Sequence, residues 1–305
     1  MDLIKRCLTS ETRSIEKARA LCRELAQSHY ENFSVASLFL PKKLRQHFYN
    51  VYAYCRLSDN LADNCVDSQS ALTSLKNWEQ ELQICYQGRP RLAVFLALQE
   101  TISAYNIPQE PFLDLLQAFK IDQVKTRYRT YGDLLEYCRY SANPVGRLVL
   151  YLGGYSDSER QELSDLICTA LQLTNHWQDI NWDFKQLKRI YIPLDDMEKF
   201  QYSESDLALR ICDKRFSELM RMEIKRTQNL FEDGLPLCSM LDGVLGAEVE
   251  LFVRSGQEIL RRIELVHYDI FRCRPTLSKW AGLKLLIKCS WSKFFTGKLQ
   301  LILGY

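Results

Sequence analysis

Two segments of the chain each carry a pair of aspartates four residues apart. Asp59 and Asp63 stand in the sequence DNLAD, and Asp179 and Asp183 stand in DINWD. Residues three and four positions apart are neighbours on an α-helix, so each segment predicts a helix that presents two carboxylates on one face. Mg²⁺ prefers oxygen ligands and is usually held by one or two carboxylates together with substrate phosphates. The two pairs therefore predict a site for Mg²⁺ and a diphosphate.

The helices that must position these pairs are otherwise rich in apolar and aromatic residues. Gln172 and Asn175 share the face of the second pair, and Arg56 shares the face of the first. The rest of the second segment offers apolar side chains to a core, namely Leu171, Leu173, Trp177, Ile180 and Trp182. For either motif alone, a solvated helix face is the common alternative, because most carboxylates are exposed. The apolar surroundings favour instead two helices that only tertiary packing brings together.

Composition limits the class of protein. The chain has 305 residues, 47% of them hydrophobic, enough for a sizeable core. Its net charge of +2 gives no general attraction for nucleic acid. The 11 cysteines are odd in number and form no C-x-x-C pair, which argues for a reducing compartment. No secretory signal stands at the N-terminus and no apolar run reaches the roughly 18 residues of a membrane span, so we expect a cytoplasmic protein.

Helical periodicity dominates the chain and strand alternation is nearly absent. We expect one all-α domain over residues 1–305, without a linker or a repeat. Its predicted helices span residues 11–28, 42–66, 69–86, 91–105, 110–120, 131–152, 158–185, 204–230, 240–266 and 277–300. Pro144 should kink the helix over 131–152. Such a break suits an apolar substrate, and a plain packing kink fits equally well.

Two basic segments leave alternatives open. Lys125, Arg127 and Arg129 suit either an anionic substrate or a solvated helix end. From Ala281 to Tyr305 no residue is acidic, and lysines mix with Leu, Ile, Trp and Phe. That composition is typical of a helix on an anionic membrane surface, which would make the protein peripheral on the inner face of a membrane. A terminal helix docked on the domain fits it too.

The nucleotide-binding motifs are missing from the sequence. It contains no G-x-G-x-x-G and no G-x-x-x-x-G-K-[ST]. We therefore see no nicotinamide or nucleotide site, and no NADPH is expected.

Taken together, several longer motifs resemble one protein family. DNLAD, DINWD and the following RIYIP resemble the squalene/phytoene synthase family of head-to-head prenyl transferases. ENFSVASLFLP, SANPVGRLVLYLGG, ICTALQLTNHWQDI and YDIFRCRPTLSKW are similar to its hydroxysqualene synthase branch, from bacterial hopanoid biosynthesis. The resemblance covers residues from about 25 to 290.

The resemblance implies an all-α isoprenoid synthase fold, a single helical domain around a central apolar cavity. It implies that Asp59, Asp63, Asp179 and Asp183 bind Mg²⁺ and the substrate diphosphate. The family positions that would bind the diphosphate are occupied by His29, Arg56, Tyr137, Asn175, Arg189 and Arg274. We expect presqualene diphosphate as the substrate and water as the second reactant. The amides Gln172 and Gln178 are candidates for positioning that water.

Three departures from the family pattern bear on the substrate. Glu31 stands where some relatives carry Lys, and Gln178 stands where others carry Arg. Both changes remove positive charge, which fits a substrate with one diphosphate better than two farnesyl diphosphates. The link between Asp183 and Arg189 is about one residue longer than usual, with Lys188 where Gly is common. Two alternatives remain, condensation of two farnesyl diphosphates and a non-catalytic helical assembly factor.

Overall fold

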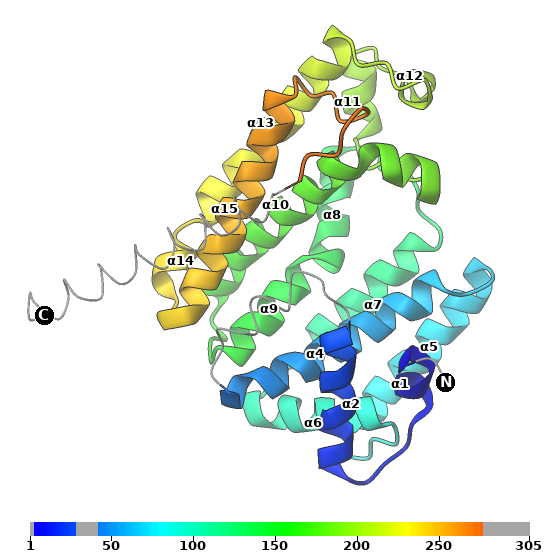
Figure 1. Ribbon diagram of the computed structural model, residues 1–305, viewed down its shortest axis with the longest axis vertical. Helices are drawn as coiled ribbons and strands as arrows, with labels where there is room; N and C mark the ends of the chain where they lie inside the picture. Colours follow the sequence, from blue (N-terminus) through cyan, green and yellow to red (C-terminus); the bar gives the residue numbers. More distant parts are fainter. Residues whose placement is uncertain (1–2, 29–41, 277–305) are drawn as a thin grey trace, which may run out of the picture. The chain divides into compact units, whose positions relative to one another are not determined.

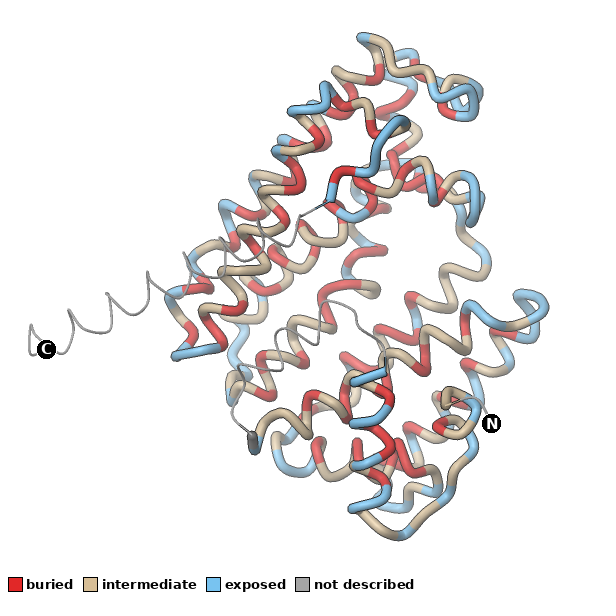
Figure 2. The backbone as a smooth tube through the Cα atoms, viewed as in Figure 1, coloured by how far each residue is buried: buried red, intermediate tan, exposed pale blue. Residues whose placement is uncertain are grey.

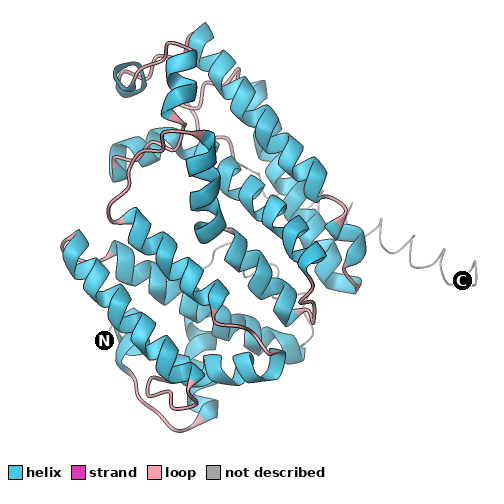
Figure 3. Ribbon diagram, turned by 180° about the vertical axis from the view of Figure 1, so that it is seen from behind, coloured by secondary structure: helices cyan, strands magenta, loops and turns pink. Residues whose placement is uncertain are grey.

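The computed structural model describes residues 3–28 and 42–276, and within these ranges the chain is all-α. Figure 3 shows helices and loops there without any strand, and only two isolated β-bridges occur, between Glu11 and Leu92 and between Arg127 and Ile190. The chain falls into two compact units. The first comprises Met1–Lys125 and Arg139–Gln161, and the second comprises Thr126–Cys138 and Glu162–Tyr305. The single domain expected over 1–305 stays a prediction.

The first unit is built around the helix that carries Asp59 and Asp63. Its helices (Figure 1) are α1 (Leu3–Thr9), α2 (Ile15–Ser28), α4 (Lys42–Asp63), α5 (Ser68–Tyr86), α6 (Ala93–Tyr105), α7 (Glu110–Asp122) and α9 (Asn143–Leu152). Helix α4 packs against α2, α5, α6, α7 and α9. The residues of α4 that this central position buries are mostly apolar, namely Phe48, Val51, Ala53, Tyr54, Leu57 and Ala62.

Aromatic rings fix α4 in the core of the first unit. Tyr54 of α4 is fully buried, and its ring packs edge-to-face on Phe112 of α7 at 5.0 Å between centroids. The Tyr54 hydroxyl donates to the carbonyl of Phe112 at 3.0 Å. On the next turn, Ser58 accepts a hydrogen bond from Trp78 Nε1 of α5 at 3.0 Å. Buried rings with a satisfied polar atom hold a helix in one rotation, so they set the direction in which the acidic pair points.

The second unit contains the helix that carries Asp179 and Asp183. Its elements are residues 131–138 of α8 (Tyr131–Ser141), residues 162–182 of α10 (Ser158–Trp182), the π-helical turn η1 (Asp183–Leu187), α11 (Leu194–Lys199), α12 (Glu204–Ala208), α13 (Lys214–Gly234), α14 (Leu237–Met240) and α15 (Gly243–Leu265). Figure 2 shows buried and exposed residues alternating along these helices, as expected of amphipathic helices with one face on a core.

Close approach of α10, α13 and α15 forms the core of the second unit. The indole Nε1 of Trp177 in α10 donates to Thr227 of α13 at 2.8 Å, and both residues are buried. At Gly256 of α15, an added Cβ would overlap the ring of Phe231 and crowd the side chain of Leu171. Glycine at this position therefore lets α15 lie against α10 and α13.

The structure bears out most predicted helices and corrects several. The helix predicted over 131–152 is broken into α8 and α9 at Ala142, one residue before the first turn of α9, which contains Pro144. Pro lacks an N–H and is tolerated in the first turn of a helix, so the break occurs just before it. The predicted helix 11–28 begins only at Ile15, and α1 and α11 were not predicted. The helix predicted over 277–300 lies outside the described residues.

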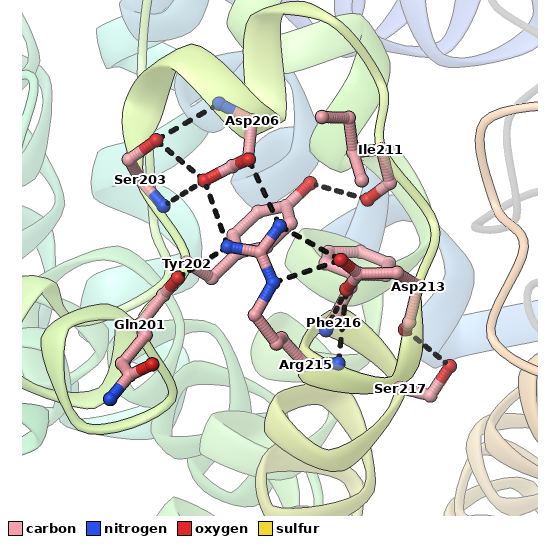
Figure 4. Close-up of polar contacts among 9 residues, drawn as sticks. All are labelled: Gln201, Tyr202, Ser203, Asp206, Ile211, Asp213, Arg215, Phe216 and Ser217. Carbon is pink, nitrogen blue, oxygen red and sulfur yellow. Dashed lines mark hydrogen bonds and ion pairs between the residues drawn. The ribbon is translucent and has the colours of Figure 1, made fainter.

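The helix predicted over 204–230 is wrong, because α12 ends at Ala208 and a second N-terminal cap, at Asp213, starts α13. Figure 4 shows the cause. Ser203 and Asp206 form a capping box that starts α12, and Asp213 accepts hydrogen bonds from the amides of Arg215 and Phe216 to start α13. The Arg215 guanidinium joins the two caps through Asp206 at 3.1 Å and Asp213 at 2.8 Å. Each cap stabilises a helix start by about 1 kcal/mol, so the pattern of 204–230 is interrupted.

Candidate functional site

The first acidic pair stands on the last two turns of α4. Asp59 is partly exposed, and Asp63 is exposed at the end of the helix. Nη1 of Arg56, one turn before, donates to Oδ2 of Asp59 at 3.0 Å. The pair therefore offers carboxylate oxygens to water with a guanidinium beside them. This is the composition of a site for a divalent cation and an anionic group.

The second acidic pair stands at the junction of α10 and η1. Asp183 is buried and Asp179 is partly exposed. The guanidinium of Arg274 pairs with Asp179 through two hydrogen bonds, one from Nε and one from Nη2 at 2.7 Å. The expected apolar side of α10 is confirmed for Trp177 but is wrong for Trp182, which is 54% exposed.

The link from Asp183 to Arg189 has an unusual backbone. Residues 183–187 form a π-helical turn, and the amides of Lys188 and Arg189 both donate to the Asp183 carbonyl. Lys188 adopts a left-handed conformation with φ of 56°. A π turn accommodates one residue more than an α-helical turn. This extra residue lets the chain return Arg189 to the side of Asp183.

Asp183 and Arg189 line one small pocket of the second unit. Its other lining residues are His176, Ile180, Ile190, Tyr191, Ile192 and Leu207. His176 stacks on Tyr191 with 3.6 Å between ring centroids. Burial, and then the charge of Arg189, lowers the pKa of His176 to about 3, so the imidazole is neutral. Its Nε2 atom has no hydrogen-bond partner in the described part of the chain.

Sequence reasoning missed His176 as a pocket residue. A lone histidine beside a tryptophan is usually part of a core, and His176 is indeed buried. The signal that could have found it is its spacing of seven residues before Asp183, which places both on one helix face. Tyr137 and Tyr191 are also buried, and their rings stack with 5.8 Å between centroids.

The polar residues predicted along α10 lie in three different environments. Gln178 is buried and its Nε2 donates to the carbonyl of Pro275. Gln172 is partly buried, whereas Asn175 is exposed. His29 and Glu31 lie outside the described residues, as does the basic segment 281–305. The roles predicted for these residues stay predictions.

Two of the arginines considered for an anionic substrate are engaged within the second unit. Arg127 makes two hydrogen bonds to Glu204, at 2.8 and 2.9 Å. Arg129 pairs with Asp195 at 2.6 Å and with Glu198 at 3.0 Å. Their carboxylate partners already neutralise these guanidinium groups. They hold the segment before α8 against α11 and α12.

The donor chemistry of the acidic pairs fits Mg²⁺. In residues 3–28 and 42–276, no group of three or more Asp, Glu, His or Cys side chains gathers to hold a metal. One or two carboxylates with substrate phosphates are, however, the usual Mg²⁺ donors. Asp59 with Asp63, and Asp179 with Asp183, supply that number in each unit. Arg56 and Arg274 beside them are the residues suited to the phosphate oxygens.

Comparisons with known proteins agree on one family. The family model described as squalene/phytoene synthase matches residues 26–281. The chain is 33% identical over 236 residues to hydroxysqualene synthase of Rhodopseudomonas palustris, covering 77% of this chain and 80% of that protein. It is 29% identical over 282 residues to phytoene synthase of Arthrospira platensis, covering 87% and 90%.

Two solved structures share the fold. The squalene synthase HpnC from Alicyclobacillus acidocaldarius is 41% identical with a TM-score of 0.81, over 88% of this chain and 99% of that one. A dehydrosqualene synthase in complex with a ligand is 25% identical with a TM-score of 0.81, over 96% and 99%. The chain therefore has the all-α isoprenoid synthase fold, as expected. Among the described helices, none combines the length and the apolarity needed to cross a membrane.

Proposed function

The chain belongs to the squalene/phytoene synthase family, and from this premise we propose that it is a hydroxysqualene synthase. The proposed reaction converts presqualene diphosphate and water to hydroxysqualene and diphosphate. The observation that carries the proposal is the similarity to the Rhodopseudomonas palustris hydroxysqualene synthase, at 33% identity over 236 residues. The family acts on prenyl diphosphates, and presqualene diphosphate belongs to this class of substrate.

The neutral side chain of Gln178 supports a substrate with one diphosphate. In this structure the Gln178 amide is buried and donates to the Pro275 carbonyl. An arginine there would add a charge beside Asp179 and Arg274. Its absence reduces the number of cations available for a second diphosphate, which condensation of two farnesyl diphosphates requires.

The residues of this chain would act by binding and orienting the substrate. Asp59, Asp63, Asp179 and Asp183 would hold Mg²⁺. When bound, Mg²⁺ supplies positive charge that stabilises the departing diphosphate. Arg56 would donate hydrogen bonds to the diphosphate oxygens, because a guanidinium binds phosphate bidentately.

The chemistry needs a leaving group, a shielded cation and one water. The C–O bond to the diphosphate breaks, and its electron pair leaves with the diphosphate. The resulting cyclopropylcarbinyl cation rearranges, a water oxygen bonds to it, and one proton is released. Gln172 and Gln178 are proposed to position this water. No electron donor is needed for this balance, so we propose that NADPH is not a cofactor.

Product analysis tests the proposal. The purified protein would be incubated with Mg²⁺, without NADPH, and with either presqualene diphosphate or farnesyl diphosphate. Hydroxysqualene from presqualene diphosphate is the expected result. Presqualene diphosphate or dehydrosqualene formed from farnesyl diphosphate would favour the condensing enzyme instead. The match to phytoene synthase, which extends over 282 residues, is the observation that favours this alternative. No turnover of either substrate would point to the assembly factor.

Substitution of the acidic pairs tests the metal assignment. We expect Asp63→Asn and Asp179→Asn each to lower turnover by at least about a hundredfold, because each removes a charged oxygen ligand where transition-state charge develops. Circular dichroism should show the same helical content as the wild type. Full turnover in both variants would remove the aspartates from the mechanism.

A further inference from the structure

Arg274 occupies the carboxylate that the proposed function assigns to a metal ion. Its Nε and Nη2 donate to Oδ1 and Oδ2 of Asp179, so each oxygen of that carboxylate accepts one hydrogen bond from the same guanidinium. This fork-to-fork pairing is the strong form of an arginine–carboxylate contact. Arg274 is 53% exposed and Asp179 is 23% exposed. The guanidinium can therefore leave Asp179 for water or for another anion without burying an unpaired charge.

The backbone around Arg274 is held independently of this ion pair. Residues 273–276, which we name the strap, follow α15 after a short turn. On one side of Arg274, Gln178 Nε2 donates to the Pro275 carbonyl, and Nη1 of Arg262 donates to the Thr276 carbonyl at 2.6 Å. These two bonds fix the strap on α10 and α15 through its main chain. The side chain of Arg274 can thus change partners while the strap stays in place.

A neighbouring arginine shows that the pairing is selective. Arg272 is 89% exposed and pairs with Asp269, three residues before it, at 2.9 Å. It is a cation on the same segment that does not occupy a metal-binding carboxylate. Local charge alone therefore does not place an arginine on Asp179, whereas the anchored strap does.

Arg274 and a divalent cation compete for the same two oxygens. A cation that binds both oxygens of Asp179 from the side of Arg274 displaces the Arg274 hydrogen bonds, and a cation at either oxygen meets the positive charge of the guanidinium. Two like charges a few ångströms apart repel each other more strongly near a protein surface than in bulk water. Exposed charges lie nearer the bulk-water case. The competition is therefore large enough to weaken cation binding measurably.

We propose that Arg274 is a positioning residue that stands in for the cation at Asp179 and exchanges onto the substrate diphosphate when Mg²⁺ binds. This inference rests on the proposed function, in which Asp179 is a metal ligand, and on the diphosphate-binding family position that Arg274 occupies. The exchange couples the two binding events, because the diphosphate offers Arg274 a second anion at the moment the cation needs Asp179. Such a coupling is a free energy shared by both ligands. Without substrate, Arg274 stays on Asp179 and the cation binds weakly.

Binding of Mn²⁺ alone tests the exchange. Mn²⁺ suits the same carboxylate ligands as Mg²⁺, and its free concentration is measured by electron paramagnetic resonance during a titration without substrate. We expect Arg274→Ala and Arg274→Gln to bind Mn²⁺ roughly fivefold or more tightly than the wild type, because the competing charge is gone. Arg272→Ala should bind Mn²⁺ as the wild type does. A merely structural role for Arg274 would leave the affinity equal or make it weaker.

The controls separate this inference from the proposed function. Asp179→Asn should weaken Mn²⁺ binding in both the wild-type and Arg274→Ala backgrounds. Equal or weaker binding in both Arg274 variants, with Asp179→Asn still impaired, overturns the exchange and leaves the metal assignment intact. Unchanged binding in Asp179→Asn overturns the metal assignment and the exchange together. Circular dichroism on each variant verifies the fold, and the product assay with presqualene diphosphate is read separately.

Discussion

One carboxylate of the second unit has no exposed surface and shares its counter-ion with another. Glu223 of α13 is fully buried, and Nη1 of Arg226 lies 3.3 Å from its Oε1. The same guanidinium holds Asp196 more closely, at 2.6 and 3.2 Å. It also lies over the ring of Tyr131, 4.6 Å from the centroid. The Arg226 guanidinium therefore pairs with two carboxylates, and the more deeply buried of the two, Glu223, is the one whose charge is destabilised more.

This arrangement predicts a pH-dependent stability. Burial raises the pKa of Glu223 to about 8, against the partial opposition of Arg226, from an ordinary value of 4.5. Between these two pH values the folded chain keeps a proton that the unfolded chain has lost, so the free energy of unfolding falls as pH rises. From pH 5 to pH 7 we expect a loss on the order of 2 kcal/mol from this group.

Replacing Glu223 by glutamine isolates that effect. Glu223→Gln keeps the shape of the side chain and removes the titration, so its free energy of unfolding in urea should change less between pH 5 and 7 than that of the wild type. Glu232→Gln, on the same helix but exposed, should behave as the wild type does. Identical pH profiles for wild type and Glu223→Gln would mean that Glu223 is ionised in the fold.

At the residue scale, spacing alone could predict the acidic pairs but not their partners. Asp-x-x-x-Asp is a local pattern, so Asp59 with Asp63 could be found without a fold. The pairing of Asp179 with Arg274 joins residues 95 positions apart and depends on how the strap returns to α10. The pocket position of His176 could be predicted only by knowing where the segment after η1 lies, since a buried histidine has no sequence signature of its own.

At the scale of elements, the π turn after α10 is where the chain departs from a simple helix. Lys188 closes this turn in the left-handed region with φ of 56°, and its carbonyl accepts a hydrogen bond from Arg127 at 2.6 Å. A residue with a Cβ pays roughly 1 to 2 kcal/mol in that conformation, whereas glycine adopts it freely. The exposed lysine side chain at this position brings no described contact that offsets this strain.

We therefore expect Lys188→Gly to stabilise the protein. The gain in the free energy of unfolding should be about 0.5 to 1 kcal/mol, since part of the relief is lost to the greater freedom of glycine in the unfolded chain. Lys185→Gly, inside the same turn but without a positive φ, should lower stability by a similar amount. Urea denaturation compares the three proteins. A loss of stability in Lys188→Gly would show that the lysine side chain makes a contact worth more than the strain.

Most helices could be predicted from periodicity, and the errors have local causes. The helix predicted over 204–230 failed because α12 ends at Ala208, Arg210 is left-handed and Asp213 caps a new helix, and a periodicity test does not detect such a break. The prediction that Trp182 packs on the core failed because α10 ends in a π turn, which changes the face that the last residues present. The prediction of a kink at Pro144 was confirmed, because the missing N–H of proline disrupts a helix regardless of tertiary context.

At the scale of the whole chain, the fold class was predictable because helical periodicity and ordered family motifs agreed over nearly all of it. The family model matches residues 26–281, which confirms that the family resemblance extends over nearly the whole chain. The substrate was not predictable to the same degree, since relatives with the same fold carry different names, phytoene synthase and hydroxysqualene synthase among them. A fold alone does not specify chemistry.

The cysteines lead to a last prediction about the chain as a whole. All ten cysteines in the described ranges are free thiols, and five of them are buried. Burial raises the pKa of Cys85 and of Cys138 to about 12, so their thiolate fraction near neutral pH is very small. Cys273 of the strap is exposed. Since the thiolate is the reactive form, thiol reactivity should differ by about a thousandfold between these classes.

Site-resolved alkylation measures that difference. On treatment of the native protein with iodoacetamide at pH 8, mass spectrometry should find the peptide containing Cys273 labelled well before those containing Cys85 and Cys138. In denaturant all three should react at similar rates, because burial is gone. A reducing agent should leave the thermal midpoint unchanged, since no disulfide joins the described cysteines. Fast native labelling would instead show that the helices around the labelled cysteine open on the timescale of the reaction, in the first unit for Cys85 and in the second unit for Cys138.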